Sequence, residues 1–253
     1  MNSPRDPPPT EGGDIDLPAS LRAAWGLPGR PTKGPKPGLS LDRIVEAAVD
    51  IAAAEGLAAV SMSRIATKLD SSPMSLYRYV AAKDELLALM VDAALGPAPA
   101  FSSPGDGWRA GLSHWAWAYH AVLRRHRWIL RVPISGPPVT PNQTVWMERG
   151  LSSLADTGLS EGDKLSVILL LSGYVRNEAT LVADLDDAAG TDKPEIMPTW
   201  GRQLRALTDP QRFPALHAAL ASEAFEHDDD PDDEFVFGLE RILDGVDALV
   251  CRR

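Results

Sequence analysis

The sequence predicts an all-α protein with an N-terminal and a C-terminal helical domain. From Ser40 onward, apolar residues recur every three or four positions, which is the period of an amphipathic helix. Alternation with period two is never sustained, and β-branched residues do not cluster, so strands are not expected. The Pro- and Gly-rich stretch "GPAPAFSSPGDG" interrupts the helical pattern. We therefore expect a first domain over residues 39–95 and a second over 96–253.

The net charge of −10 is unevenly distributed along the chain. Between Arg30 and Lys83 there are eight Lys and Arg against five Asp and Glu, whereas residues 96–253 contain 15 basic and 23 acidic residues. Because the field of a protein is local, the acidic total does not exclude nucleic-acid binding by the N-terminal part.

Targeting signals are not apparent in the sequence. The N-terminus "MNSPRDPPPTEGG" has no apolar core, and no run of about 18 apolar residues predicts a membrane span. Cys251 is the single cysteine, which excludes an internal disulfide framework. We expect a cytoplasmic protein without membrane contact.

The first 38 residues contain nine prolines and six glycines and are expected to form a flexible tail. Within it, "LPASLRAAWGL" favours a short helix that begins at Pro18 and places Leu21, Ala24 and Trp25 on one face. The basic stretch "GRPTKGPKPG" follows, with Arg30, Lys33 and Lys36.

Four helices are predicted between residues 40 and 95. Ser40 and Ser61 are expected N-caps of the first two, and Gly56 ends the first. Ser72, with Pro73 at the first helical position, begins the third helix, "SSPMSLYRYV". Asp70 lies before it, at a helix end where the backbone often becomes left-handed. The fourth helix is "KDELLALMVDAALG".

Three short helices within about 40 residues, the last two joined by a tight turn, predict a helix-turn-helix. Leu76 and Val80 of the third helix face inward. Outward side chains of such a helix can enter a major groove about 12 Å wide. The expected outward residues are Met74, Ser75, Arg78 and Tyr79, with Tyr77 and Lys83 at the rim to contact phosphates. The alternatives are that Tyr77 is a core aromatic, Lys83 a solvated lysine, and Arg78 a partner of a surface acid.

The segment "SLDRIVEAAVDIAAAEGLAAVSMSRIATKLDSSPMSLYRYVAAKDELLALM" resembles the DNA-binding domain of the TetR/AcrR family of bacterial transcriptional regulators. The pieces that carry the resemblance are "A..A..EG", "S.SRIATKL", "LYRYV" and "K.ELL", within residues 40–92. The resemblance implies a homodimer on a palindromic DNA operator, a helical ligand-binding domain, and release from DNA by a small-molecule effector. It also implies base contacts by Ser63, Met74, Ser75 and Tyr79, and phosphate contacts by Ser61, Tyr77 and Lys83. The segment "RPTKGPKPG" looks like the basic arm of some members, although it is equally well explained as a linker.

The second domain is expected to contain helices over about 105–127, 141–157, 161–183, 197–207, 212–226 and 232–251. The first of these carries tryptophans on opposite sides, which is typical of a helix buried between neighbours. Pockets are mostly apolar with a few polar anchors, so some of these residues are candidates to line an effector pocket. The candidates, each of which has a plain core alternative, are His114, Trp115, Trp117, Trp146, Tyr174 and Asn177.

Two apolar stripes predict the dimer interface, one on the helix at 161–183 and one on the last helix. The alternative is that both stripes close the core of a monomer. The residues expected at the interface are Leu165, Leu169, Ser172, Leu239, Ile242, Leu243 and Val246.

Other kinds of site find little support. "EHDDDPDDE" (226–234) lacks the ligand spacing and glycine of an EF-hand loop, and no phosphate loop or catalytic motif is present. We therefore predict no metal, no cofactor and no enzymatic activity. The predicted function is that of a ligand-responsive transcriptional regulator. We expect a repressor that a small, largely apolar effector releases from an inverted-repeat operator. A ligand-independent regulator or activator, and an all-helical enzyme, remain the alternatives.

Overall fold

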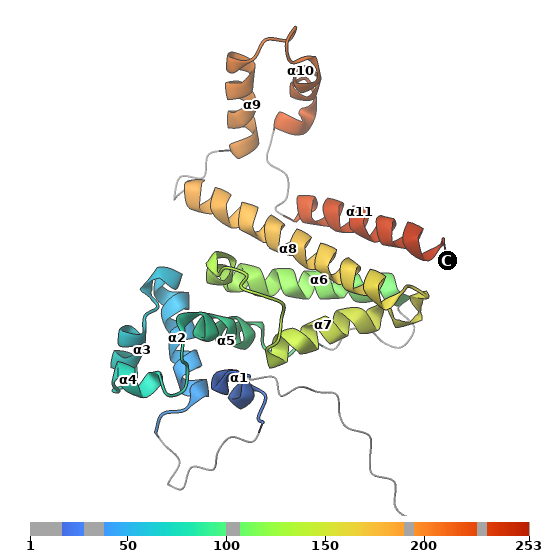
Figure 1. Cartoon of the computed structure of the whole chain (residues 1–253). Coiled ribbons are helices and arrows are strands. Elements are labelled where there is room, and N and C mark those ends of the chain that lie inside the picture. The colour runs from blue at the N-terminus through green and yellow to red at the C-terminus, as the bar shows by residue number, and fades with distance from the viewer. Residues whose placement is uncertain (1–16, 28–37, 100–106, 190–194, 227–231, 253) are drawn as a thin grey trace, which may run out of the picture. The chain divides into compact units, whose positions relative to one another are not determined.

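The computed structural model describes residues 17–27, 38–99, 107–189, 195–226 and 232–252. Within these ranges every regular element is helical and no strand occurs, so the all-α prediction is confirmed (Figure 1). Short 3₁₀ turns, labelled η1 to η4, separate several of the α-helices.

The helices divide between two compact units, which are described separately. The first, here called the reading unit, runs to Ala93 and also contains the distant segment Ser135–Pro141. The second, the C-terminal unit, contains residues 94–134 and 142–253. The predicted boundary at residues 95–96 lies close to the end of the first part of the reading unit. The inclusion of Ser135–Pro141 with the N-terminal helices was not predicted.

The reading unit is built around one small apolar core. Its elements are α1 (Ala19–Ala24), α2 (Leu41–Glu55), η1 (Leu57–Ala59), α3 (Met62–Lys68), α4 (Pro73–Leu76) and the greater part of α5 (Lys83–Leu95). This core contains Ile44 of α2, Ile65 of α3, Leu76 of α4, Val80 of the turn after α4 and Met90 of α5, all completely buried. The short helix expected after Pro18, within the N-terminal tail, is present as α1.

Serine hydroxyls begin three helices of the reading unit, as predicted. Ser40, Ser61 and Ser72 each accept a hydrogen bond of 3.3 Å from the backbone N–H three residues later, which satisfies one free N–H of the first turn. Asp70 takes the left-handed conformation with φ +49°, as expected for the residue that ends α3. The turn between α3 and α4 is thus set by local chemistry.

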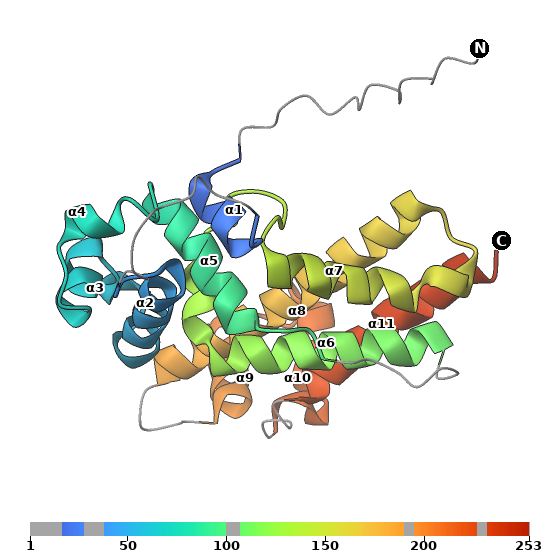
Figure 2. The same cartoon turned by 90° about the horizontal axis from the view of Figure 1, so that it is seen from below.

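The C-terminal unit contains two long helices and several shorter ones. They are α6 (Gly107–Arg125), η2 (Arg127–Arg131), α7 (Pro141–Ser153), η3 (Ala155–Thr157), α8 (Glu161–Ala189), α9 (Ile196–Leu207), α10 (Pro214–Leu220), η4 (Glu223–Phe225) and α11 (Asp233–Val250). Figures 1 and 2 show α6, α8 and α11 side by side, and these three contact one another. Phe235, Leu112 and Leu171, one from each helix, are buried between them.

Two predicted helices of this unit are each divided in the structure. The helix expected over 212–226 is α10 followed by η4, because the Ser222 hydroxyl accepts the N–H of Ala224 and starts a new turn. The helix expected over 141–157 ends as α7 and continues as η3. In contrast, the helix predicted over 161–183 runs on to Ala189.

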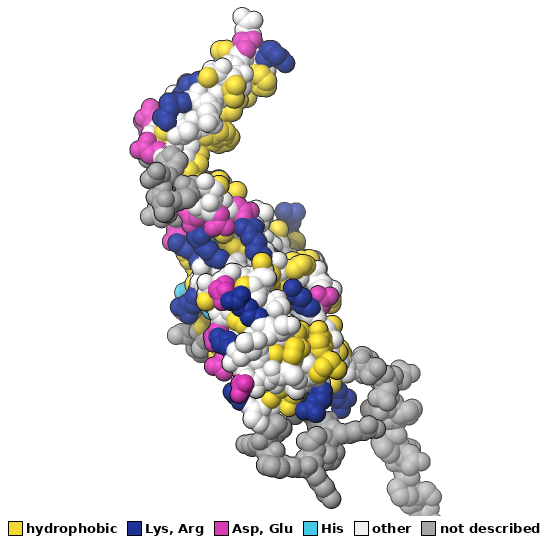
Figure 3. All heavy atoms as spheres, turned by 90° about the vertical axis from the view of Figure 1, so that its left-hand side faces the viewer, with side chains coloured by type: hydrophobic (Ala, Val, Ile, Leu, Met, Phe, Trp, Pro, Cys, Tyr) yellow, Lys and Arg dark blue, Asp and Glu magenta, His cyan; other side chains and the backbone are white. Residues whose placement is uncertain are grey.

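Three short elements follow α8 in the sequence and precede α11. They are α9, α10 and η4, and they contact one another. Gly201 permits this packing, because a Cβ at that position would lie 2.9 Å from Cβ of Phe225. Large apolar side chains remain exposed here, including Trp200 at 48% and Leu207 at 81%. Figure 3 shows hydrophobic side chains along one flank of this portion, at the top of the view.

The helix α8 is long and apolar enough to cross a membrane by length and composition, although no membrane span was predicted. Only 33% of the relevant window is buried. A core helix of a soluble protein passes the same test, so this one helix is weak support for a span. Lys164 and Glu178 of α8 are charged residues buried within the unit, and both are costly in hydrocarbon.

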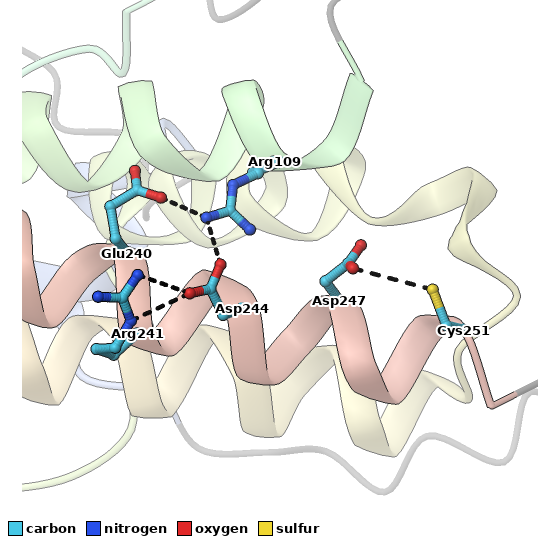
Figure 4. Close-up of polar contacts among 6 residues, drawn as sticks. All are labelled: Arg109, Glu240, Arg241, Asp244, Asp247 and Cys251. Carbon is cyan, nitrogen blue, oxygen red and sulfur yellow. Dashed lines mark hydrogen bonds and ion pairs between the residues drawn. The ribbon is translucent and has the colours of Figure 1, made fainter.

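Close approach and ion pairs fasten α11 to its neighbours. A Cβ on Gly238 would lie 2.4 Å from the Tyr174 hydroxyl oxygen, so glycine lets the ring reach α11. That hydroxyl lies 2.9 Å from the carbonyl oxygens of Glu234 and Phe235. In Figure 4, Arg109 of α6 reaches Glu240 and Asp244 of α11.

Asp244 is the centre of this ion-pair group. It accepts hydrogen bonds from Arg241 at 2.8 and 3.1 Å and from Arg109 at 2.7 Å. The hydrogen bonds from Arg241, and then those from Arg109, hold the pKa of Asp244 below its usual value. All three side chains are substantially exposed, so the contribution of the group to stability is small.

Candidate functional site

The surface of α4 and the turn after it presents the strongest candidate site. Met74 is 74% exposed and Tyr77 is 45% exposed, although both are large apolar or amphipathic side chains. Arg78 and Lys83 are also exposed. Beneath them, Leu76 and Val80 are completely buried, so the exposed residues stand on a fixed base. The alternative that Tyr77 is a core aromatic is not supported.

The predicted third helix is shorter than expected. Its α-helical part is the single turn Pro73–Leu76, after which Tyr79 N–H bonds to the Leu76 carbonyl three residues earlier, at 2.8 Å. A hydrogen bond to the third residue back winds the chain more tightly than the α-helical bond to the fourth residue back. The chain therefore leaves the α-helix after Leu76, and the Tyr79 side chain is turned away from the outward face.

Two of the residues predicted to face the bases have other partners. The Tyr79 hydroxyl donates to the Leu39 carbonyl oxygen at 2.9 Å, and its ring is half-buried, so Tyr79 links the α4 turn to the residue before the N-cap of α2. Ser75 is half-buried, and its hydroxyl lies 2.9 Å from that of Ser72. In this structure the Tyr79 hydroxyl supports the turn, and Ser75 is less accessible than expected for a base contact.

The charges of this surface are divided between paired and unpaired cations. Arg64 of α3 forms an ion pair with Glu55 of α2, and Lys68 lies 2.8 Å from Asp50. Arg78 and Lys83 form no ion pair with any residue that the structure describes in this unit. The alternative that Arg78 pairs with a neighbouring acid is thus not seen. These two cations lie on either side of Tyr79 in sequence and are free to meet phosphate.

The remaining predicted DNA-contacting residues lie close by or outside the described ranges. Ser61 and Ser63 are both exposed at the start of α3. Ser61 is also the N-cap of that helix, so its hydroxyl has a structural role in the absence of DNA. Arg30, Lys33 and Lys36 lie outside the residues that the structure describes.

The predicted effector-pocket residues do not gather at one place. Trp115 and Trp146 are buried, and the Trp115 indole N–H donates to the Trp146 carbonyl at 2.9 Å. The Trp146 indole N–H donates to the Gly96 carbonyl at 3.1 Å. Tyr119 completes this first aromatic cluster, with its ring centroid 5.4 Å from that of Trp115. Because both indole N–H groups are used within the protein, these tryptophans are core residues.

A second aromatic cluster surrounds a buried histidine and carboxylate. His120 Nε2 lies 2.7 Å from Glu178 Oε2, and their side chains are 3% and 9% exposed. The His120 ring stacks on Phe235 with centroids 4.2 Å apart, and Trp117 meets Phe235 edge-on at 4.6 Å. Tyr174 stacks on the same ring at 5.8 Å. Of the predicted pocket residues, only Trp117 and Tyr174 belong to this cluster.

His114 and Asn177 are exposed and belong to neither cluster, so the structure does not support them as pocket residues. Glu178, the partner of His120, was missed by the sequence prediction. It lies in no recognisable motif, and helical spacing alone gave no signal that it would meet His120. Among the residues described, no group of three metal-binding side chains is close enough to hold an ion.

Arg176 and Tyr119 form a polar group beside the first cluster. The Arg176 guanidinium donates to the carbonyl oxygens of Ile129 at 3.0 Å and of Val132 at 2.9 Å, which holds η2 against α8. Burial raises the pKa of Tyr119, and the positive charge of Arg176 partly opposes this rise. In the same region the indole N–H of Trp128 is buried without an acceptor among the described residues. A buried donor of this kind is available to an acceptor on a bound molecule.

The predicted dimer residues separate into exposed and buried sets. Leu165 and Leu169 of α8 are 50% and 74% exposed, whereas Ser172 and Ile242 are half-buried. Leu239, Leu243 and Val246 are at most 4% exposed in the single chain. These three are corrected to core residues of the C-terminal unit, because α11 turns that stripe toward its own neighbours. On α11, the exposed apolar residues are Val236 and Phe237.

The short helices α3 and α4, joined by a tight turn on a buried core and followed by exposed Met74, Tyr77, Arg78 and Lys83, define a helix-turn-helix DNA-binding regulator. Comparisons with known proteins agree. Residues 44–90 match the model of bacterial regulatory proteins of the tetR family, and residues 99–250 match the tetracyclin repressor-like C-terminal domain. The chain belongs to the TetR family, and it is a ligand-responsive, DNA-binding transcriptional repressor of that family.

Individual relatives resemble most of the chain. The HTH-type transcriptional repressor DrrR1 of Streptomyces coeruleorubidus is 40% identical over 245 residues, which cover 95% of this chain and 89% of DrrR1. The tetracycline repressor class D of Escherichia coli is 26% identical over 83% of this chain and 90% of its own length. The structure of ActR from Streptomyces coelicolor bound to actinorhodin has a TM-score of 0.69 at 31% identity, and covers 86% of this chain and 99% of ActR.

Proposed function

We propose that the protein is a cytoplasmic homodimer that binds an inverted-repeat operator and is released from it by a small, largely apolar effector. The observation that carries the DNA-binding part is the exposed group of Met74, Tyr77, Arg78 and Lys83 on a buried base. Met74 and Arg78 are suited to base edges in the major groove. Tyr77 and Lys83 are suited to phosphate oxygens. In this function, the protein catalyses no reaction.

The free faces of α8 and α11 support dimer formation. Leu165, Leu169, Leu181 and Leu185 follow one another at four-residue intervals or multiples of four, and are between 41% and 74% exposed. Gly173 belongs to the same series, and a Cβ there would meet nothing within 4 Å. Asn177 interrupts the series between Gly173 and Leu181, so the exposed leucines form two groups along α8. Exposed apolar groups of this kind are typical of an interaction site. We propose that they pack, together with Phe237, against a second copy of the chain.

A symmetric dimer places two reading units on one DNA duplex. Half-sites are then expected one helical turn apart, about 34–36 Å, or a multiple of that distance. Effector binding in the C-terminal unit would favour a dimer whose reading units no longer match this spacing. A roughly 100-fold loss of DNA affinity requires about 2.7 kcal/mol of differential effector binding between the two states.

The effector site is proposed beside η2, at the buried indole N–H of Trp128. Aromatic rings offer flat apolar contacts, and the free donor suits a carbonyl or hydroxyl oxygen on the effector. ActR has been solved with actinorhodin and with (S)-DNPA, and these compounds are suitable first probes. A probe that binds the folded protein raises the melting temperature, and above Kd the stabilisation grows with the logarithm of the probe concentration. Trp128→Phe should reduce that shift.

Selection from a random duplex library tests the DNA-binding part directly. We expect an inverted-repeat consensus, with affinity that falls steeply as salt increases. Lys83→Ala should weaken binding to all sequences alike and reduce the slope of log K against log salt by about 0.9. Arg212→Ala, which removes a charge from the C-terminal unit, is the matched control and should leave the slope unchanged. Binding without any sequence preference would refute the proposal.

A further inference from the structure

The helix α1 is attached to the reading unit at two separate points. It has six residues and no side-chain N-cap, and an isolated helix of this length is not stable in water. Its order therefore depends on what it contacts. Ser20, near its start, is only 3% exposed, although serine is usually a surface residue. Figure 2 shows α1 beside α5, with the segment that precedes α7 passing next to it.

The first attachment is to Glu85, in the first turn of α5. The Ser20 hydroxyl donates to Glu85 Oε2 at 2.7 Å, and the backbone N–H of Ala81 donates to the same oxygen at 3.2 Å. Ala81 follows Val80, the buried residue that ends the α4 turn, and Lys83 begins α5. Glu85 therefore joins α1, the link after the α4 turn and α5 at one carboxylate oxygen.

The second attachment is at the other end of α1. Gly26, with φ +62°, ends the helix, and the Leu27 N–H bonds back to the Arg22 carbonyl at 2.9 Å, as in a Schellman motif. This termination orients Trp25, whose indole N–H donates to the Val139 carbonyl at 2.8 Å. Val139 lies in the segment Ser135–Pro141, which belongs to the reading unit although it lies between η2 and α7 in sequence. Thr140, next to Val139, is 3% exposed.

We infer that α1 is a strap that holds the segment Ser135–Pro141 to the base of the α4 turn. Along the chain, three residues separate η2 from Ser135, and Arg176 holds η2 through the carbonyls of Ile129 and Val132. When an effector displaces η2, the movement is transmitted along the backbone to Val139. From Val139 it passes to α1 through the Trp25 hydrogen bond. The Ser20 hydrogen bond then carries it from α1 to Glu85, which also holds the backbone two residues before Lys83. This regulatory role rests on the proposed function, whereas the strap itself does not.

Hydrogen exchange of the full chain without DNA tests the strap. The Trp25 indole N–H, which donates to the Val139 carbonyl at 2.8 Å, reports directly on the second attachment. Ser20→Ala does not touch this hydrogen bond, yet it should speed exchange of the indole N–H about five- to tenfold, because it loosens α1. The matched control, Ala19→Ser, changes an exposed residue of the same helix and should have no effect. Unchanged exchange of the Trp25 indole N–H in Ser20→Ala overturns the strap.

The regulatory role is tested with the operator duplex selected from the library. Because coupling is reciprocal, operator binding should slow exchange of the Trp25 indole N–H in the natural protein and not in Ser20→Ala. Equal protection in both proteins overturns the regulatory role. If no sequence-specific duplex is obtained, the proposed function fails, while the experiment without DNA still decides on the strap.

Discussion

Replacing Tyr77 and Tyr79 one at a time by phenylalanine separates a DNA contact from a structural support. The two phenols are two residues apart, but the structure gives them different surroundings. The Tyr77 hydroxyl is exposed and belongs to the surface proposed to meet phosphate, whereas the Tyr79 hydroxyl donates to the Leu39 carbonyl at 2.9 Å. Each substitution removes one oxygen and leaves the ring, so packing is preserved in both variants.

The magnitudes follow from what each hydroxyl contacts. Loss of the Tyr79 hydrogen bond should lower the free energy of unfolding by about 1 kcal/mol, which is a fall in Tm of about 2–4 °C for a chain of this size. Its effect on DNA affinity should be less than about threefold. Loss of a phosphate contact from Tyr77 should reduce DNA affinity by about 1–2 kcal/mol, or about 5- to 30-fold, without lowering Tm.

Thermal unfolding and fluorescence anisotropy with a labelled operator measure the two quantities. Because tyrosine is uncharged, neither variant should change the slope of log K against log salt. If Tyr79→Phe weakened DNA binding as much as Tyr77→Phe and left Tm unchanged, the Tyr79 hydroxyl would be a DNA contact. The assignment of Tyr79 as a support would then be refuted.

Three further predictions concern the C-terminal unit. Gly238→Ala places a Cβ 2.4 Å from the Tyr174 hydroxyl, so the ring must move and lose its hydrogen bonds. Alanine has the better helix propensity, but we still expect the free energy of unfolding, measured with denaturant, to fall by about 1–2 kcal/mol. Gly162→Ala, at an open position of α8, should be neutral or stabilising, and similar behaviour of both variants would contradict this account. Leu169→Glu places a charge on the stripe proposed for the dimer, and should shift the protein toward monomer in sedimentation velocity; an unchanged dimer would exclude that face. Burial, and then the charge of Arg125, lowers the pKa of His126, so the unfolded chain binds more protons than the folded chain below about pH 6.5. The stability of the natural protein should therefore fall from pH 7.5 to 5.5, and it should fall less steeply in His126→Gln. Equal pH dependence of the two proteins in thermal unfolding would disprove this contribution.

Local chemistry made most of the reading unit predictable. Ser40, Ser61 and Ser72 cap their helices, and Asp70 takes the left-handed conformation, because these effects act over three or four residues. The direction of Tyr79 was not predictable in the same way. It depends on the backbone hydrogen bond from Tyr79 N–H to the Leu76 carbonyl, three residues back. It also depends on the hydrogen bond from the Tyr79 hydroxyl to the Leu39 carbonyl, 40 residues away in sequence.

The faces of the C-terminal helices were harder to predict, because several of them are apolar on two sides. The stripe of Leu239, Leu243 and Val246 on α11 was identified, but periodicity does not tell whether its neighbours are in the same chain or in another. Similarly, Trp115 and Trp117 are about 200° apart on α6, and they join different aromatic clusters. Which cluster borders an effector depends on tertiary packing.

The inclusion of Ser135–Pro141 in the reading unit affects how the protein can be divided. A fragment that stops near residue 95 keeps every helix of the reading unit, yet it lacks the Val139 carbonyl that Trp25 binds. Such a fragment retains the surface of Met74, Tyr77, Arg78 and Lys83, but one end of α1 has no acceptor. A fusion protein that uses this unit as a DNA-targeting module would therefore be better made with the whole chain, or with a short linker that carries residues 135–141 back to α1.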